Sequence, residues 1–338
     1  MDLNFIWFIL LMFLIIGYAI LDGFDLGVGI LHFFSKSDDE RRININAIAP
    51  VWDGNEVWLI TAGGALFAAF PIVYATVFSG FYIAFMLLLT ALIFRAVSME
   101  FRGKVDSPRW RKIWDFGFAS GSLLSALLFG VTAGNILRGI PINSELMFEG
   151  NFIGLLNPYS LLTGLIAVVL FSLHGGIFLM QKTEGVHKEN IAGKLNGLWI
   201  IFVILFFVLL LYTIFEARYL FDNVLRNPLF YFFSALLLLS VIYIPVGIKS
   251  GKFKAAFIAS SLIILSMISS MSVSLFPSFI PSSISKEFNL TIYNASSSQT
   301  TLQTMLIIAL IGMPLVILYT IFIYKVFKGK VIITKDSY

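Results

Sequence analysis

The chain has 338 residues, of which 59% are hydrophobic and only 12% are charged, with a formal net charge of +4. An ordinary soluble domain carries about twice that share of charged residues, so this composition indicates an integral membrane protein. Because the sequence contains no cysteine, it excludes thiolate metal ligands, iron–sulfur clusters and disulfide bonds.

Nine apolar runs follow one another along the chain, each about long enough to cross a bilayer as a helix. They cover residues 5–33, 56–78, 79–99, 114–137, 155–180, 195–215, 229–248, 255–277 and 303–327. We therefore expect an all-α integral membrane protein that forms a single polytopic domain over residues 1–338. The first run lacks a charged leader and a cleavage site, so we expect it to be a retained helix. Pro71 is expected to kink the second run or end it early.

The distribution of Lys and Arg predicts the orientation in the membrane, since these residues accumulate in cytoplasmic loops. Alternate loops carry basic clusters, for example at residues 102–112 and 249–254. The intervening loops hold only Arg138, Arg218, Arg226 and Lys286. With nine spans, this asymmetry places the N-terminus outside and the C-terminus in the cytoplasm. The basic loops are then topology signals, and no nucleic-acid partner is needed to explain them.

Two carboxylates lie inside the first run. Asp22 and Asp25 are one turn apart in the segment ILDGFDLGVG. An acid near the bilayer centre costs about 2.5–3.5 kcal/mol on insertion scales, so each requires a partner, a proton or a water-filled path. They could relay protons, or they could lie near the inner end of the helix and pair with a basic loop residue. The residues alone leave both interpretations open.

The start of the second run repeats this pattern. Asp53 and Glu56 are one turn apart and lie between Trp52 and Trp58. An N-cap role is the ordinary explanation for an acid such as Asp53 in the first turn of a helix, but it does not explain both acids. Tryptophan is typical of the membrane–water interface, so these residues are expected at the cytoplasmic mouth of the helix.

More polar residues fall at the inner ends of the next two runs. Arg95 and Glu100 end the third run, and Asp115 follows two tryptophans at the start of the fourth. If the first four helices form a bundle, Asp25, Asp53, Glu56 and Asp115 should gather at one membrane depth. This coincidence is the strongest functional signal that the residues themselves carry.

The three histidines argue against haem ligation by this chain. A di-haem membrane cytochrome needs axial His or Met residues on facing helices. His174 is the only deep histidine, and a polar contact favoured by the adjacent glycines is the better interpretation of it. His32 ends the first run and is expected to cap it, while His187 lies in an inner loop. Metal-binding and dinucleotide motifs are absent from the sequence.

Several long segments are distinctive: DGFDLGVGIL, ERRININAIAPVWDGNEVWLITAGGALFAAFPIVYATVFSGFY, RWRKIWDFGF, GNFIGLLNPYSLLTG and TIYNASSSQTTL. Together they resemble subunit II of the cytochrome bd quinol oxidases. The resemblance extends from the first run to the last, and the segment from Glu40 to Tyr82 is too long to match by chance.

The resemblance implies a nine-helix fold of two four-helix bundles plus one peripheral helix, here 1–137, 155–277 and 303–327. It implies a heterodimer with the larger subunit I, which carries haems b558, b595 and d and the quinol site. In this family electrons pass from quinol to oxygen, which is reduced to water with protons drawn from the cytoplasm. The expected location is the cytoplasmic (inner) membrane of a bacterium or archaeon. A structural quinone and a small accessory single-helix subunit are further candidates.

The family's proton path uses acids that match Asp25 and Asp53, with Asp22 and Asp115 as nearby candidates. Glu56 joins them on position and chemistry alone. Four further residues are expected to position these acids or to lie at the subunit interface: Trp52, Trp58, Arg95 and Glu100. A purely structural role for the chain beside subunit I stays open. A proton-coupled secondary transporter is disfavoured, because no paired broken helices are visible in the sequence.

Overall fold

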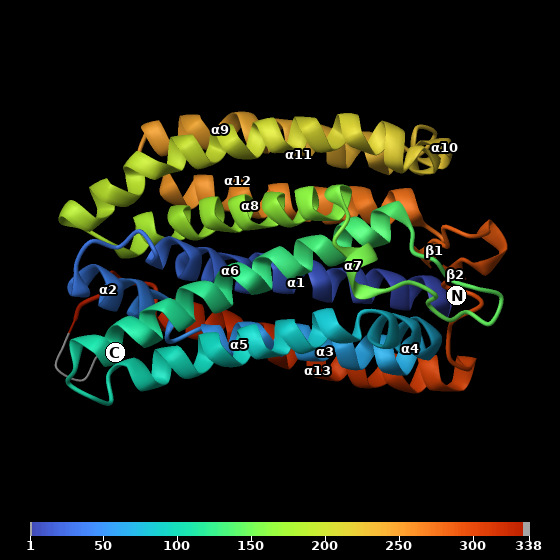
Figure 1. The fold of residues 1–338 in the computed structure, drawn as a ribbon, viewed down its shortest axis with the longest axis horizontal. Coiled ribbons are helices and arrows are strands. Elements are labelled where there is room, and N and C mark those ends of the chain that lie inside the picture. The colour runs from blue at the N-terminus through green and yellow to red at the C-terminus, as the bar shows by residue number, and fades with distance from the viewer. Residues whose placement is uncertain (1, 334–338) are drawn as a thin grey trace.

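The structure, a computed structural model, describes residues 2–333. Its long helices run side by side along one axis, with α1 between the two outer layers (Figure 1). The long helices are α1 (Leu3–His32), α3 (Trp52–Ala69), α5 (Tyr82–Arg102), α6 (Pro108–Arg138), α8 (Pro158–Lys182), α9 (Gly185–Glu216), α11 (Pro228–Lys249), α12 (Phe253–Leu275) and α13 (Gln299–Val326).

Short elements connect these helices at the two ends of the bundle. They are α2 (Asp38–Ile48), α4 (Pro71–Gly80), α7 (Phe152–Leu155), the 3-10 turns η1 (Arg218–Leu220) and η2 (Lys286–Phe288), and α10 (Phe221–Val224). Strand β1 (Ser278–Ile280) pairs antiparallel with β2 (Leu290–Thr291). We call the end where α1 finishes at His32 the inner end; in the predicted orientation it faces the cytoplasm.

Eight of the described helices are long and apolar enough to cross a membrane, and there are nine spans if the bent pair α3–α4 counts as one. In lipid the backbone must satisfy its own hydrogen bonds, which is why the apolar runs become helices. The predicted class, an all-α integral membrane protein, is therefore confirmed. Which face of the membrane holds each terminus stays a prediction.

The second predicted run is not one straight helix. α3 ends at Ala69, Phe70 leaves the helical conformation, and α4 begins at Pro71 with an axis bent by 119°. Proline cannot donate a backbone hydrogen bond and its ring clashes with the preceding turn, so the break expected at Pro71 occurs there. A second difference lies in α9, which begins at Gly185 rather than near residue 195, because a polar turn precedes its apolar part.

α1 packs against α3, α6, α8, α12 and α13, so it lies at the centre of the fold. Its closest approach is to α8: a Cβ atom added at Gly27 would lie 1.8 Å from the carbonyl oxygen of Phe171. Glycine is required at this crossing because apolar side chains gain little by leaving lipid, so helices associate through close backbone packing.

One buried apolar cluster extends through α1, α6, α8, α9 and α12 and includes Phe24, Phe118, Leu173, Phe202 and Ile263. α6 and α8 also pack against each other where Gly130 and Gly134 of α6 meet Thr163 of α8. Helices from both predicted bundles thus share a core, and the division at 1–137 and 155–277 stays a prediction.

Candidate functional site

Three carboxylates surround one guanidinium inside the bundle, and we call Asp22, Asp25, Glu56 and Arg95 the Arg95 cluster. Arg95 Nη2 lies 2.7 Å from Asp22 Oδ1, and Nη1 lies 3.1 Å from Asp22 Oδ2. Nη1 also donates to Glu56 Oε1 at 2.7 Å. Asp25 Oδ2 is farther, 3.9 Å from Nη2. The side chains of Asp22 and Asp25 are fully buried, and that of Arg95 is 1% exposed.

Local sequence places these groups on facing helices. Asp22 and Asp25 are three residues apart, so α1 presents both on one side. Arg95 lies two turns before the end of α5, opposite Gly121 of α6, where an added Cβ would lie 3.0 Å from the Arg95 backbone nitrogen. The small residue on α6 thus lets the arginine backbone approach closely.

Charge balance defines what the Arg95 cluster can do. Asp22 is paired bidentately with Arg95, the strong geometry for a guanidinium and a carboxylate, and also accepts from the Tyr18 hydroxyl at 2.9 Å. If all three carboxyl groups are ionised, one guanidinium leaves two negative charges uncompensated. Burying unpaired charge is costly, so the cluster is chemically suited to take up protons.

Asp53 does not cap α3. The helix begins at Trp52 with Val51 at the N-cap position and no side-chain cap, so the alternative explanation of Asp53 as an N-cap does not hold. Asp53 instead lies exposed in the first turn. One turn further along is Glu56, whose side chain is 18% exposed and bonds to Arg95. The acids of α3 therefore lead stepwise from the surface of the chain to the buried cluster.

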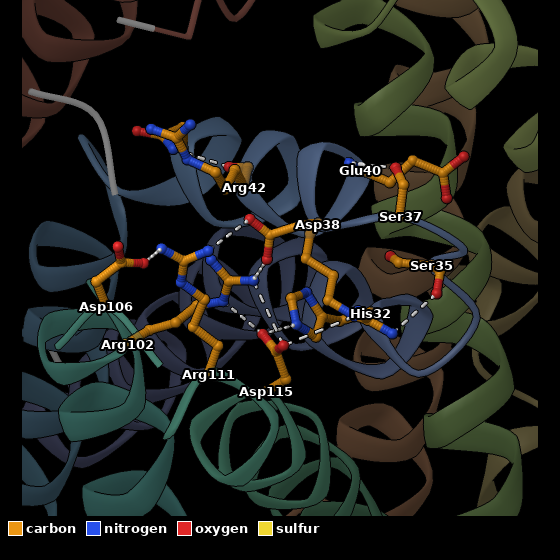
Figure 2. A network of polar contacts seen from close by, with 12 residues as sticks. His32, Ser35, Ser37, Asp38, Glu40, Arg42, Arg102, Asp106, Arg111 and Asp115 are labelled. Atoms are coloured by element: carbon orange, nitrogen blue, oxygen red, sulfur yellow. Dashed lines mark hydrogen bonds and ion pairs between the residues drawn. The ribbon is translucent and has the colours of Figure 1, made fainter. Parts of the chain in front are cut away.

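A second network lies at the inner end of the bundle, and we call its five main residues the His32 cluster (Figure 2): His32, Asp38, Arg102, Arg111 and Asp115. Asp115 Oδ1 lies 2.8 Å from His32 Nε2 and 2.6 Å from Arg102 Nε. Asp38 of α2 contacts Arg102 at 2.5 Å and Arg111 at 3.5 Å. The expected cap at His32 is therefore wrong, because its ring bonds to Asp115 and ties α1 to α6.

The acids do not gather at one membrane depth, contrary to the sequence-based expectation. Asp25 precedes His32 by seven residues on α1, which is about 10 Å along a helix. Asp115 lies beside His32, whereas Asp25 and Glu56 lie with Asp22 around Arg95. Helix register separates them, since Arg95 is level with Gly121, six residues beyond Asp115 on α6.

The two tryptophans of α3 differ in their surroundings. Trp58 is 6% exposed and packs on α1, where a Cβ at Gly17 would lie 2.3 Å from its ring. Gly17 is at the middle of α1, about 22 Å from its inner end, so Trp58 does not lie at the cytoplasmic mouth where it was expected. Trp52 is half-buried against the core. Glu100 is half-buried near the inner end of α5.

Helix α2 is attached to α9 by a third set of contacts. Glu40 accepts from the backbone N–H of Lys36 at 2.6 Å and from Asn190 Nδ2 at 2.8 Å. Burial works against ionisation, but these two hydrogen bonds outweigh it and hold the pKa of Glu40 below its usual range. His187 Nε2 bonds to Asn44 of α2 at 2.8 Å. These contacts fix the helix that leads into α3.

Each of the three histidines bonds to a protein group. His174 contacts Ser260 through Nδ1 at 2.6 Å and the Ile20 carbonyl through Nε2 at 3.0 Å, as a polar link between helices. His32 and His187 each use Nε2 on a protein partner. Within residues 2–333 no group of three His, Asp or Glu side chains could hold a metal ion.

Sequence reasoning missed Asn55, Tyr18 and Tyr324, which hydrogen-bond to the Arg95 cluster or to its neighbours. In the sequence, the signal for Asn55 was an amide placed between two acids in the segment WDGNEVW. A cavity of about 590 Å³ lies at the other end of the bundle, lined by Arg138 and Lys286 among others. None of the predicted site residues lines it.

Comparison with known proteins decides the family. The family model described as "Cytochrome bd terminal oxidase subunit II" matches residues 3–327. The chain belongs to the cytochrome bd oxidase subunit II family. It is 38% identical to cytochrome bd-I ubiquinol oxidase subunit 2 of Escherichia coli K12, over 99% of this chain and 96% of the relative. It is 36% identical to cytochrome bd ubiquinol oxidase subunit 2 of Bacillus subtilis, over 98% and 97%.

The fold is also that of a cytochrome bd oxidase chain. The chain superposes on one from the structure of bd oxidase from Geobacillus thermodenitrificans with a TM-score of 0.80, over 97% of this chain and 99% of the other. The two sequences are 16% identical there, so this likeness concerns the fold alone. As a cytochrome bd subunit II with several apolar spans and bacterial relatives, the chain is a multi-pass membrane protein of the bacterial type.

Proposed function

We propose that this chain is the non-haem subunit II of a quinol:oxygen oxidoreductase, a terminal oxidase that reduces oxygen to water in the cytoplasmic (inner) membrane of a bacterium or archaeon. Its family membership supports this, as do relatives named as ubiquinol oxidase subunits in Escherichia coli and Bacillus subtilis. The N-terminus lies outside and the C-terminus in the cytoplasm, as the basic loops predict.

In this proposal haems b558, b595 and d belong to subunit I, which also binds the quinol. His174, the only histidine deep in a predicted span, uses both ring nitrogens on protein partners, which favours that assignment. When bound to the partner, the haems supply the electron transfer and the oxygen chemistry. The present chain stabilises subunit I and is not catalytic alone. A structural quinone and a small accessory single-helix subunit are further members of the proposed complex.

The chain also contributes carboxylates to the cytoplasmic proton path. Asp53 is the entry group, Glu56 is the next acid, and Asp22 and Asp25 receive protons at the Arg95 cluster. The single observation that carries this assignment is a set of three carboxylates, two of them fully buried, that face one guanidinium and lie one turn from an exposed acid. Three residues position these acids through packing rather than by carrying protons: Trp52, Trp58 and Glu100.

Asp115 has a different role in this proposal. Its carboxylate lies within 4 Å of Arg102, His32 and Arg41. A carboxylate held by two guanidinium groups favours the ionised form and is a poor proton carrier. We therefore propose that Asp115 anchors α1, α2 and α5 to α6 at the inner end, beside rather than on the path.

A purely structural role for the acids is the second candidate, because the Arg95 cluster also joins α1, α3 and α5. Asp53→Asn separates the two candidates. Asp53 is exposed and is not the helix cap, so its loss should leave folding unchanged. If it loads protons, oxygen consumption should slow at least tenfold, which is about 1.4 kcal/mol of barrier. Glu56→Gln should also slow oxygen consumption.

The control is Asp39→Asn, which removes an exposed acid from α2 at the same end of the bundle. All three variants are compared as assembled complexes with equal haem content, read from the optical spectrum. Native rates of oxygen consumption in Asp53→Asn and Glu56→Gln would leave the structural role as the better account. A haem-free preparation of the intact complex would contradict the assignment to the oxidase itself.

A further inference from the structure

A chain of three hydrogen-bonded side chains joins α13 to the Arg95 cluster. The Tyr324 hydroxyl donates to Asn55 Oδ1 at 3.0 Å, and Asn55 Nδ2 donates to Asp25 Oδ2 at 2.7 Å. We propose that Tyr324 and Asn55 are positioning residues that hold the Asp25 carboxyl group in one orientation, with Oδ2 bound and Oδ1 open for proton transfer. The effect on turnover rests on the proposed proton path; the effect on geometry does not.

The amide of Asn55 is satisfied in one orientation only. Besides Asp25, its Nδ2 donates to the Leu21 carbonyl at 3.2 Å, so both amide hydrogens and the amide oxygen have partners. If the amide turned over, its oxygen would face the carboxylate and the carbonyl, and both contacts would join acceptor to acceptor. Asn55 is buried, so water cannot replace the lost partners at low cost.

Asn55 orients the carboxyl group of Asp25, whereas Arg95 orients the carboxyl groups of Asp22 and Glu56. Asp22 has both oxygens on Arg95, and Glu56 bonds to the same guanidinium at 2.7 Å. Asp25 Oδ2 is 3.9 Å from that guanidinium, beyond hydrogen-bond distance, and its buried Oδ1 has no hydrogen-bond partner among the described residues. The Asn55 amide is therefore the group that orients this carboxyl.

Tyr324 in turn orients Asn55 from a helix that has few other polar ties. Within the described part of α13, the side chains that hydrogen-bond to another long helix are Gln299 at the outer end and Tyr324 near the inner end. The ring of Tyr324 also packs edge-on against Phe24 at 6.3 Å. A bond that served only to fasten α13 would not change the Asp25 carboxyl, and this difference can be measured.

The first test is the infrared spectrum of the assembled complex. The bands of the Asp25 carboxyl group are identified as those lost in Asp25→Asn. Tyr324→Phe removes one hydroxyl and keeps the ring, and it should shift these bands. The matched control, Tyr319→Phe, removes a hydroxyl from an exposed position of the same helix and should leave them unchanged. Bands that stay in place in Tyr324→Phe overturn the positioning role, whatever the turnover.

The second test is oxygen consumption at equal haem content. Loss of one hydrogen bond of ordinary strength should slow Tyr324→Phe about two- to tenfold. In an Asp25→Asn background the same change should have no further effect, because the residue acts through Asp25. Further slowing in that background, or native turnover of Tyr324→Phe with shifted bands, overturns the functional part of the inference.

These measurements also separate this inference from the proposed function. If Asp25→Asn itself keeps native turnover, the proton path through Asp25 is wrong, while shifted bands in Tyr324→Phe still support the positioning role. If Tyr324→Phe lowers the haem content, Asn55→Leu breaks the same link at its centre. Unshifted Asp25 bands in Asn55→Leu then refute the inference.

Discussion

The crossing of α1 and α8 allows a quantitative prediction for Gly27→Ala. The added Cβ would lie 1.8 Å from the Phe171 carbonyl oxygen, whereas a carbon–oxygen contact needs about 3.3 Å. The helices must therefore separate by about 1.5 Å at this point. A gap of 0.5–1 Å already removes about a quarter to a half of the dispersion energy between facing atoms. A gap of about 1.5 Å should therefore remove a larger share of the dispersion energy at this crossing.

Overpacking typically costs about 1–3 kcal/mol, and because the clash is with backbone we expect the upper end of that range. About 3 kcal/mol is roughly a hundredfold in the folding equilibrium. The shift of α1 also strains the 2.7 Å contact between Asp22 and Arg95. The expected result is less assembled complex and a lower midpoint of thermal denaturation in detergent. Both are measured by haem absorbance after size-exclusion chromatography.

The matched control is Gly63→Ala on α3, where an added Cβ meets nothing within 4 Å. It should lower neither the amount of complex nor the midpoint, because alanine also has the higher helix propensity. If Gly27→Ala matches Gly63→Ala in both measurements, the close crossing does not determine stability and the reasoning is refuted.

Two further predictions concern the segments between the long helices. A cysteine replacing Ser144 should react with an impermeant thiol reagent in intact cells and one replacing Ser250 should not, because the two loops lie on opposite sides in the predicted orientation; labelling at Ser250 would reverse that orientation. The depressed pKa of Glu40 means that its ionised form stabilises α2 above the unfolded pKa, near 4.3, and that this contribution disappears as pH falls through the lower folded value. Amide hydrogen exchange in α2, corrected for its intrinsic pH dependence, should therefore accelerate below about pH 4 in the native protein; an equal acceleration in Glu40→Gln would contradict this.

Much of the fold followed from local properties of the sequence. Apolar runs of about 20 residues predicted the spans because lipid leaves a backbone no partner but its own helix. Pro71 marked a break in a helix because proline lacks the amide hydrogen wherever it occurs. The polar contact expected at His174 was also inferred correctly, since a buried imidazole needs partners in any packing. These inferences depend on a residue and its neighbours in the chain.

The tertiary structure decided which polar groups meet. Hydropathy gives each helix a length but neither its rotation nor its register against the next helix. For this reason the sequence could not pair Asp22 with Arg95, 73 residues away, or join Asn55 to Tyr324 across 269 residues. Register also moved Asp115 out of the predicted group of acids, and the slot at Gly17 drew Trp58 into the bundle. Membrane depth and partners are set by helix packing, and packing depends on the shapes of both surfaces together.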